Sequence, residues 1–325
     1  HYILAAQKGE QWVADDKAID ERLAALREAN GGKPPNIVYV LLDDIGYGEI
    51  GTPGLTPSRG YSTPNIDAFA RQGLTLGRMY TEPSCTPTRV AMMTGRLPVR
   101  TGTTEAKATL AGDGLAGEEI TLAEILKDAG YYTSHVGKWH MGDIKQAYAT
   151  EQGFMHAEFP IHQQGQLAIM HGDAASADVI RGSDPTRQQQ TYTLDDTFAV
   201  NPSHMVTGVE VRDGKLYEVD LKAGEEWTQK KYREMNERYQ ANALAQLREL
   251  AKQDKPFFLN YGPLFPLNFV PNDIEKPRTL NGGTVAETIV EVDSWVGEIV
   301  DEVDRLGIAD NTIVVVMGDN GPFMQ

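Results

Sequence analysis

The sequence predicts an α/β protein built around a buried, mostly parallel β-sheet. Three segments are nearly continuous runs of apolar residues: 36–42, 256–261 and 312–317. A fourth strand is expected at 131–136. Apolar runs without polar alternation are typical of strands that are covered on both faces, as in a parallel sheet. Helical patterns separate these strands, and this alternation indicates an α/β architecture.

The helices are expected between the strands, each with a start or stop signal. Apolar residues at helical spacing within 14–30 are followed by Gly31-Gly32, which would end a helix. The apolar positions of 284–306 recur every three to four residues, as on the buried face of an amphipathic helix. Further helices are expected at 64–73, 121–129 and 227–252.

The chain is expected to comprise an N-terminal helical extension, residues 1–35, and one large domain, residues 36–325. Its 325 residues are enough to bury a large core. Residues 145–225 are weakly patterned, and we expect them to form irregular loops near the substrate. The exception is a hairpin over 209–219 that turns at Asp213-Gly214, a strong hairpin signal.

Composition and charge exclude some classes of function. The chain has 46 acidic and 30 basic residues and a formal net charge of −16, which argues against a nucleic-acid binder, because that function needs a basic surface. The apolar runs are far too short to span a bilayer. Any attraction for an anionic substrate must therefore come from a local positive site or a metal ion.

Cysteine content does not identify the cellular compartment. The single cysteine cannot form an internal disulfide, and the first residues carry no recognisable signal peptide. We expect a periplasmic or secreted protein whose leader has been removed, with the cytoplasm as the alternative. The oligomeric state is left open.

The only cysteine, Cys85, stands at a predicted helix start. It is followed by Thr86-Pro87, and proline is tolerated in a first helical turn because its missing N–H would have no helical partner there. Arg89 would project from the same face one turn later. A helix N-terminus and an arginine suit a reactive group that must meet an anion. The alternative is a buried structural thiol.

Two predicted strands end in oxygen donors. Asp43-Asp44 follows the strand at 36–42, and Asp319-Asn320 follows the strand at 312–317. Ligands of open α/β sheets bind at the carboxyl ends of strands. Three carboxylates and an amide oxygen suit a hard cation, Ca²⁺ or Mg²⁺, and are poor ligands for zinc. The alternative is turn chemistry, because Asp and Asn commonly follow strands.

A cationic pair follows the strand at 131–136. Lys138 and His140 are two residues apart, so in an extended backbone they would face the same side. The alternative is a solvated lysine beside a structural histidine. The other histidines match no motif and are expected at the surface or in packing: His1, His135, His156, His162, His171 and His204.

Together these segments resemble a known family. Cys-x-Pro-x-Arg at 85–89, followed by Thr94-Gly95-Arg96 and by Gly-Lys-Trp-His at 137–140, resembles the signature of the type I sulfatases, in the alkaline-phosphatase superfamily. The resemblance covers roughly residues 36–325. It implies a three-layer α/β/α fold with a mostly parallel, mixed sheet. The family's smaller C-terminal subdomain is expected to be missing from this chain.

The resemblance also implies an activity, hydrolysis of a small-molecule or carbohydrate sulfate ester. A maturation enzyme would convert Cys85 to Cα-formylglycine, whose hydrated aldehyde is the nucleophile. Calcium, with magnesium second, would be bound by Asp43, Asp44, Asp319 and Asn320 and would contact residue 85. Lys138 would bind sulfate, His140 would assist the formylglycine, and Arg89 would stabilise charge.

The chain departs from the family pattern in two places. Many sulfatases carry a second active-site histidine after the strand at 256–261, but here the nearest polar candidate is Asn268. A later sulfate-binding lysine of the family is also not found. Two alternatives therefore remain: a phosphonate monoester or phosphodiester hydrolase of the same superfamily, and a non-catalytic protein that binds sulfated glycans.

Overall fold

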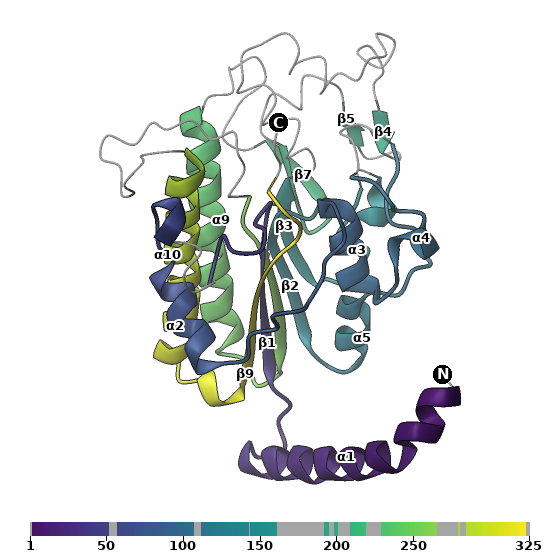
Figure 1. Ribbon diagram of the computed structural model, residues 1–325. Helices are drawn as coiled ribbons and strands as arrows, with labels where there is room; N and C mark the ends of the chain where they lie inside the picture. Colours follow the sequence, from purple (N-terminus) through teal and green to yellow (C-terminus); the bar gives the residue numbers. More distant parts are fainter. Residues whose placement is uncertain are drawn as a thin grey trace.

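The computed structural model shows a three-layer α/β domain with a helix that extends from one end (Figure 1). It describes residues 2–51, 57–106, 112–142, 144–160, 192–194, 198–200, 209–218, 229–264, 279 and 284–322. None of the helices in these ranges is long and apolar enough to cross a membrane.

The central sheet has seven strands in the order β7-β6-β3-β2-β8-β1-β9. Five of them form a parallel block: β3 His156–Pro160, β2 Tyr132–Gly137, β8 Phe257–Gly262, β1 Asn36–Leu42 and β9 Thr312–Gly318. The antiparallel hairpin of β6 Val209–Arg212 and β7 Lys215–Glu218 extends the sheet beyond β3. The predicted mixed, mostly parallel sheet is confirmed, and its C-terminal strand ends share one edge.

Helices cover both faces of the sheet, as the three-layer prediction requires (Figure 1). One face packs against α2 Pro64–Gln72, α9 Gln229–Leu250 and α10 Thr284–Arg305, which contribute residues such as Ile66, Leu247 and Val296 to one core cluster. The other face packs against α3 Cys85–Thr94 and α5 Leu122–Asp128, which contribute Val90 and Ala123 to a second cluster. The short α4 Pro98–Thr101 follows α3.

Burial along two strands shows where the sequence pattern was informative and where it was not. Val38 and Val40 of β1 belong to one core cluster and Tyr39 packs against the other, so β1 is covered on both faces as predicted. β9 was also predicted to be buried, and that is wrong. Among the described residues its one sheet neighbour is β1, and Ile313 is 50% exposed.

Other elements differ in extent from the predictions. The N-terminal helix, α1 Tyr2–Ala29, is longer than the expected 14–30 and projects away from the sheet (Figure 1). The predicted hairpin is confirmed, and Asp213 and Gly214 both have the positive φ of a two-residue hairpin turn, 47° and 71°. Strand β3, within the region expected to be irregular, was missed. That region also contains the short hairpin of β4 Tyr192–Leu194 and β5 Phe198–Val200.

Candidate active site

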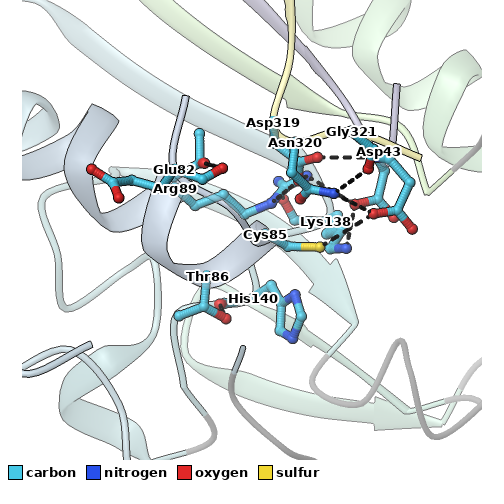
Figure 2. Close-up of polar contacts among 12 residues, drawn as sticks. Asp43, Glu82, Cys85, Thr86, Arg89, Lys138, His140, Asp319, Asn320 and Gly321 are labelled. Carbon is cyan, nitrogen blue, oxygen red and sulfur yellow. Dashed lines mark hydrogen bonds and ion pairs between the residues drawn. The ribbon is translucent and has the colours of Figure 1, made fainter. Parts of the chain in front are cut away.

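Residues from four elements meet at the C-terminal edge of the parallel sheet (Figure 2). Asp43 and Asp44 follow β1, and Asp319 and Asn320 follow β9. Cys85 and Arg89 lie in the first turns of α3, and Lys138 follows β2. All seven are buried. Asp43, Asp44, Cys85 and Asp319 each offer one ligand atom, and these four atoms lie within 4.8 Å of one another.

The register of β1 and β9 brings the two acidic pairs together. Leu42 pairs with Gly318, so Asp43 and Asp319 leave neighbouring strands at the same level. The Asp319 amide donates to the Leu42 carbonyl at 2.9 Å, and the Asp44 amide donates to Asp319 Oδ1 at 3.0 Å. Asp44 has a φ of 53°, which is uncommon outside glycine and is typical of a functional turn.

Cys85 is the first residue of α3, as predicted. Its neighbour Ser84 is extended, and Pro87 lies in the first turn without disturbing the helix. The Sγ atom lies 3.7 Å from Asp44 Oδ1. Burial raises the pKa of the Cys85 thiol, and the surrounding carboxylates raise it further, although Lys138 opposes them. In the metal-free site these groups favour the thiol over the thiolate, which is the better nucleophile.

Arg89 joins α3 to both strand ends. Its Nε and Nη2 donate to Asp319 Oδ2 at 3.1 and 2.8 Å, and Nη2 lies 3.6 Å from Asp43 Oδ1. Its Nη1 donates to the Lys138 carbonyl at 2.9 Å. Burial alone would lower the pKa of Arg89, but Asp319 and Asp43 outweigh it and raise the pKa. Arg89 is thus a fixed positive charge at the site.

Lys138 lies inside the carboxylate cluster and forms an ion pair with Asp43. Only 1% of its surface is exposed. Burial would lower its pKa, but the neighbouring negative groups, Asp43 foremost, together outweigh burial and raise the pKa, so the amine is charged. Its backbone amide donates to the Gly262 carbonyl at 2.6 Å, which fixes the lysine to the end of β8.

His140 lies near Cys85, but not for the reason that the sequence suggested. The backbone is not extended there, because His140 has a φ of 59°. Its carbonyl accepts a hydrogen bond from Thr86 Oγ1 at 2.9 Å, which ties it to the first turn of α3. Figure 2 shows its imidazole on the Thr86 side of Cys85, whereas Lys138 lies among the carboxylates.

The donor set fits a hard divalent cation. Burial raises the pKa of Asp44, and burial together with Asp43 raises that of Asp319 to about 6, although Lys138 and Arg89 offset part of this rise. Asn320 Nδ2 donates to Asp44 Oδ1 at 2.7 Å, while its buried Oδ1 has no hydrogen-bond partner among the described residues. An unused amide oxygen beside three carboxylates is the ligand chemistry of Ca²⁺ or Mg²⁺.

Sequence reasoning missed the glycine that shapes this site from β8. A Cβ on Gly262 would lie 2.7 Å from the Lys138 carbonyl and 3.3 Å from Arg89 Nη1, so a side chain there would displace both. In the sequence, nothing about residues 260–262 pointed to the site except that residue 262 is a glycine. The candidate Asn268 lies outside the described residues, as do His162, His171 and His204, which were expected at the surface or in packing.

The comparisons with known proteins agree with this geometry. The family model described as Sulfatase matches residues 35–325, and the chain therefore belongs to the sulfatase family. It is 33% identical over 310 residues to N-acetylgalactosamine-6-sulfatase of Rattus norvegicus, covering 91% of this chain and 52% of the relative. It is 30% identical over 300 residues to arylsulfatase A of Homo sapiens, covering 89% and 52%.

A solved structure supports the same assignment. The PsFucS1 sulfatase from Pseudoalteromonas sp. superposes with a TM-score of 0.75 at 26% identity, covering 94% of this chain and 59% of that one. The chain spans about half the length of the curated relatives it matches.

Proposed function

We propose that the protein hydrolyses sulfate monoesters, with residue 85 as the nucleophile after conversion to formylglycine and with a bound Ca²⁺ ion. One observation carries the proposal. Cys85 begins a helix 3.7 Å from Asp44, within a cluster of carboxylates that also holds Arg89 and Lys138. A helix N-terminus, two fixed cations and a hard-metal donor set around one side chain suit attack on an anionic ester.

Conversion of Cys85 is supported by the state of its thiol. The thiol is buried and its pKa is raised, so it would have little thiolate at neutral pH. Formylglycine would supply the nucleophile in its hydrated form, with one hydroxyl to attack sulfur and a second to expel sulfate later. A maturation enzyme is therefore a required partner.

The charges of the site favour a monoanionic substrate. The carboxylates of Asp43, Asp44 and Asp319 contribute three negative charges, and Arg89 and Lys138 contribute two positive ones. A divalent cation, bound by these carboxylates and by Asn320, would leave the site with one net positive charge and would polarise the oxygens around sulfur. A sulfate monoester carries one negative charge and would neutralise it.

The described side chains are assigned the two remaining roles, charge stabilisation and proton transfer. Lys138 and Arg89 hold positive charge where negative charge develops on the sulfuryl oxygens, the usual electrostatic contribution to catalysis. We assign to His140, whose backbone is tied to the first turn of α3, the role of accepting a proton from the formylglycine diol. The substrate class that we propose includes sulfated sugars as well as aryl sulfates.

The test begins with the chemistry of residue 85. The whole protein is produced together with a formylglycine-generating enzyme, and the mass of the peptide containing residue 85 is measured by mass spectrometry. Conversion exchanges sulfur and two hydrogens for oxygen and lowers the mass by about 18 Da. Full turnover by protein that retains the thiol would overturn the mechanism.

Sulfate release is then measured with aryl and sugar sulfates. Cys85→Ala is expected to abolish release, whereas Met92→Leu, on the same helix and outside the cluster, is expected to retain it. Faster turnover of phosphonate esters of the same phenol would favour the phosphonate hydrolase. Binding of sulfated sugars without release would indicate a non-catalytic protein.

A further inference from the structure

A buried histidine on β2, His135, lies three residues before the proposed sulfate-binding lysine, Lys138. His135 is fully buried, and its register partner on the neighbouring strand is Asn260 of β8. Residues in register on adjacent strands present their side chains on the same face of a sheet. Both of its ring nitrogens have partners: Nδ1 lies 2.8 Å from Asn260 Nδ2, and Nε2 lies 3.0 Å from the Gly137 carbonyl.

The hydrogen bonds assign a single neutral tautomer to His135. A carbonyl can only accept, so Nε2 must carry the proton that points to Gly137. In a neutral ring Nδ1 is then an acceptor, which matches the amide N–H of Asn260. Burial lowers the pKa of His135 to about 3, so the ring is neutral at ordinary pH.

An aromatic cage holds the ring in this orientation. Trp139 packs edge-on at 5.1 Å between ring centroids, and Phe154 and Phe159 lie at 5.5 and 6.2 Å. Trp139 is itself fixed, because its indole N–H donates to the Ala147 carbonyl at 2.7 Å. The imidazole therefore has little freedom to turn away from Gly137.

The atom that His135 contacts belongs to the peptide bond that leads into Lys138. The carbonyl of that peptide unit accepts from His135 Nε2, and its N–H donates to the Gly262 carbonyl at 2.6 Å. Both polar atoms of this peptide unit are thus held, the carbonyl by a side chain of β2 itself and the N–H by the backbone of β8. Gly137 has a φ of 92°, a conformation that favours glycine, so the chain turns sharply out of β2 at this point.

We propose that His135 is a positioning residue for sulfate binding: with Asn260 it fixes the Gly137–Lys138 peptide unit and thereby the approach of the Lys138 amine to the substrate. This inference rests on the proposed function. The ammonium group reaches its place only if the backbone before it keeps one orientation, and Arg89 bonds to the carbonyl of the same lysine. Loss of the imidazole would leave the Gly137 carbonyl without its donor.

The test separates the hydrogen bonds from simple packing. His135→Phe retains a ring in the aromatic cage but removes both bonds, whereas His135→Gln offers one donor and one acceptor in their place. Phe258→Leu is the matched control, because Phe258 is equally buried in the same core cluster and its ring contacts Phe154 rather than His135. All variants are made in the whole, matured protein with Ca²⁺ present.

Two quantities are measured: KM and kcat for an aryl sulfate, and the affinity for inorganic sulfate from the rise in melting temperature on sulfate titration. His135→Phe is expected to raise both KM and the sulfate dissociation constant about tenfold, which corresponds to about 1.4 kcal/mol. His135→Gln is expected to stay within about threefold of the wild type. Phe258→Leu is expected to lower the melting temperature but to leave sulfate affinity unchanged.

The inference is overturned if His135→Phe weakens sulfate binding no more than Phe258→Leu does, or if His135→Gln is no better than His135→Phe. Should His135→Phe fail to fold, Asn260→Leu tests the same pair, because it removes the donor to His135 Nδ1; sulfate binding no weaker than in Phe258→Leu would then overturn the inference. An inactive wild-type protein would instead contradict the proposed function. The two failures are therefore distinguishable.

Discussion

Arg89 donates two hydrogen bonds to a single oxygen of Asp319, at 2.8 and 3.1 Å, and both side chains are almost completely buried. The pair joins the helix that begins at residue 85 to the last strand of the sheet. Because the two charges have no access to bulk water, each depends on the other for its stability in the folded protein.

Arg89→Ala should strongly destabilise the metal-free protein, because Asp319 would keep a buried carboxylate without its main cation. Breaking a buried pair by removing one partner costs about 3–5 kcal/mol. Urea unfolding in the presence of EDTA measures the change. Arg248→Ala is the control: that arginine pairs with Glu302 at 2.7 Å but is 46% exposed, and loss of an exposed pair costs about 0–1 kcal/mol. Equal losses for the two variants would contradict this account.

Calcium should stabilise the protein through the carboxylate cluster. The melting temperature is expected to rise with Ca²⁺ concentration, by an amount equivalent to about 2.7 kcal/mol at one hundred times the dissociation constant. Asp44→Asn and Asn320→Ala should each reduce this rise, because each removes a proposed ligand. Asp128→Asn, an exposed acid at the end of α5, should not. A parallel Mg²⁺ titration identifies the preferred ion, and a rise that is undiminished in Asp44→Asn would place the metal elsewhere.

Gly262→Ala should impair the site with little effect on the rest of the fold. Its new methyl group would lie 2.7 Å from the Lys138 carbonyl, so the lysine or β8 must move. We expect a fall in sulfate release of at least about tenfold and a stability loss of about 1–3 kcal/mol, as for an overpacked core. Gly117→Ala is the control, because its Cβ would meet nothing closer than 3.8 Å. Wild-type activity in Gly262→Ala would show that the contact is easily relieved.

The attachment of the β6–β7 hairpin should depend on pH through His156. This side chain lies 3.3 Å from carboxylate oxygens of both Glu158 and Asp213, the latter in the hairpin turn, and the Glu158 hydrogen bond is the main cause of its raised pKa. A histidine whose folded pKa is raised contributes stability that is complete below its unfolded pKa of about 6.5 and is lost as pH rises through the folded pKa.

The corresponding measurement compares thermal unfolding of the wild type and His156→Gln between pH 6 and 8.5. The advantage of the wild type should be largest at pH 6 and should shrink as the pH rises above about 6.5. A difference that stays constant over this range would mean that His156 stabilises the hairpin without its charge.

The fold could be predicted where periodicity and burial agree. Residues 36–42 have no polar alternation because both faces of β1 are covered, and their bounds were predicted correctly. The same pattern at 312–317 was misleading, since an apolar run does not report whether a strand has one neighbour or two. Strand β3 was missed because five residues, His156–Pro160, contain too few positions to show a period.

Some residues of the site could be predicted from the sequence and others could not. The acidic strand ends, Cys85 and Lys138 all carry chemistry in their side chains, and the structure brings them together as expected. Gly262 and His135 act through contacts with backbone atoms, which leave no pattern in a sequence. The location of His140 depends on a left-handed backbone at that residue, and spacing alone does not reveal it.

The placement of Asp319 at the end of β9 also has a kinetic consequence. Arg89 and Asp319 are separated by 230 residues, so Asp319, unlike Asp43 and Asp44, is synthesised long after Cys85. At about 5–20 residues per second, translation of that interval takes roughly 10–50 s. For that time the growing chain presents Cys85 without β9 beside it, and the thiol is open to chemistry that the finished fold excludes.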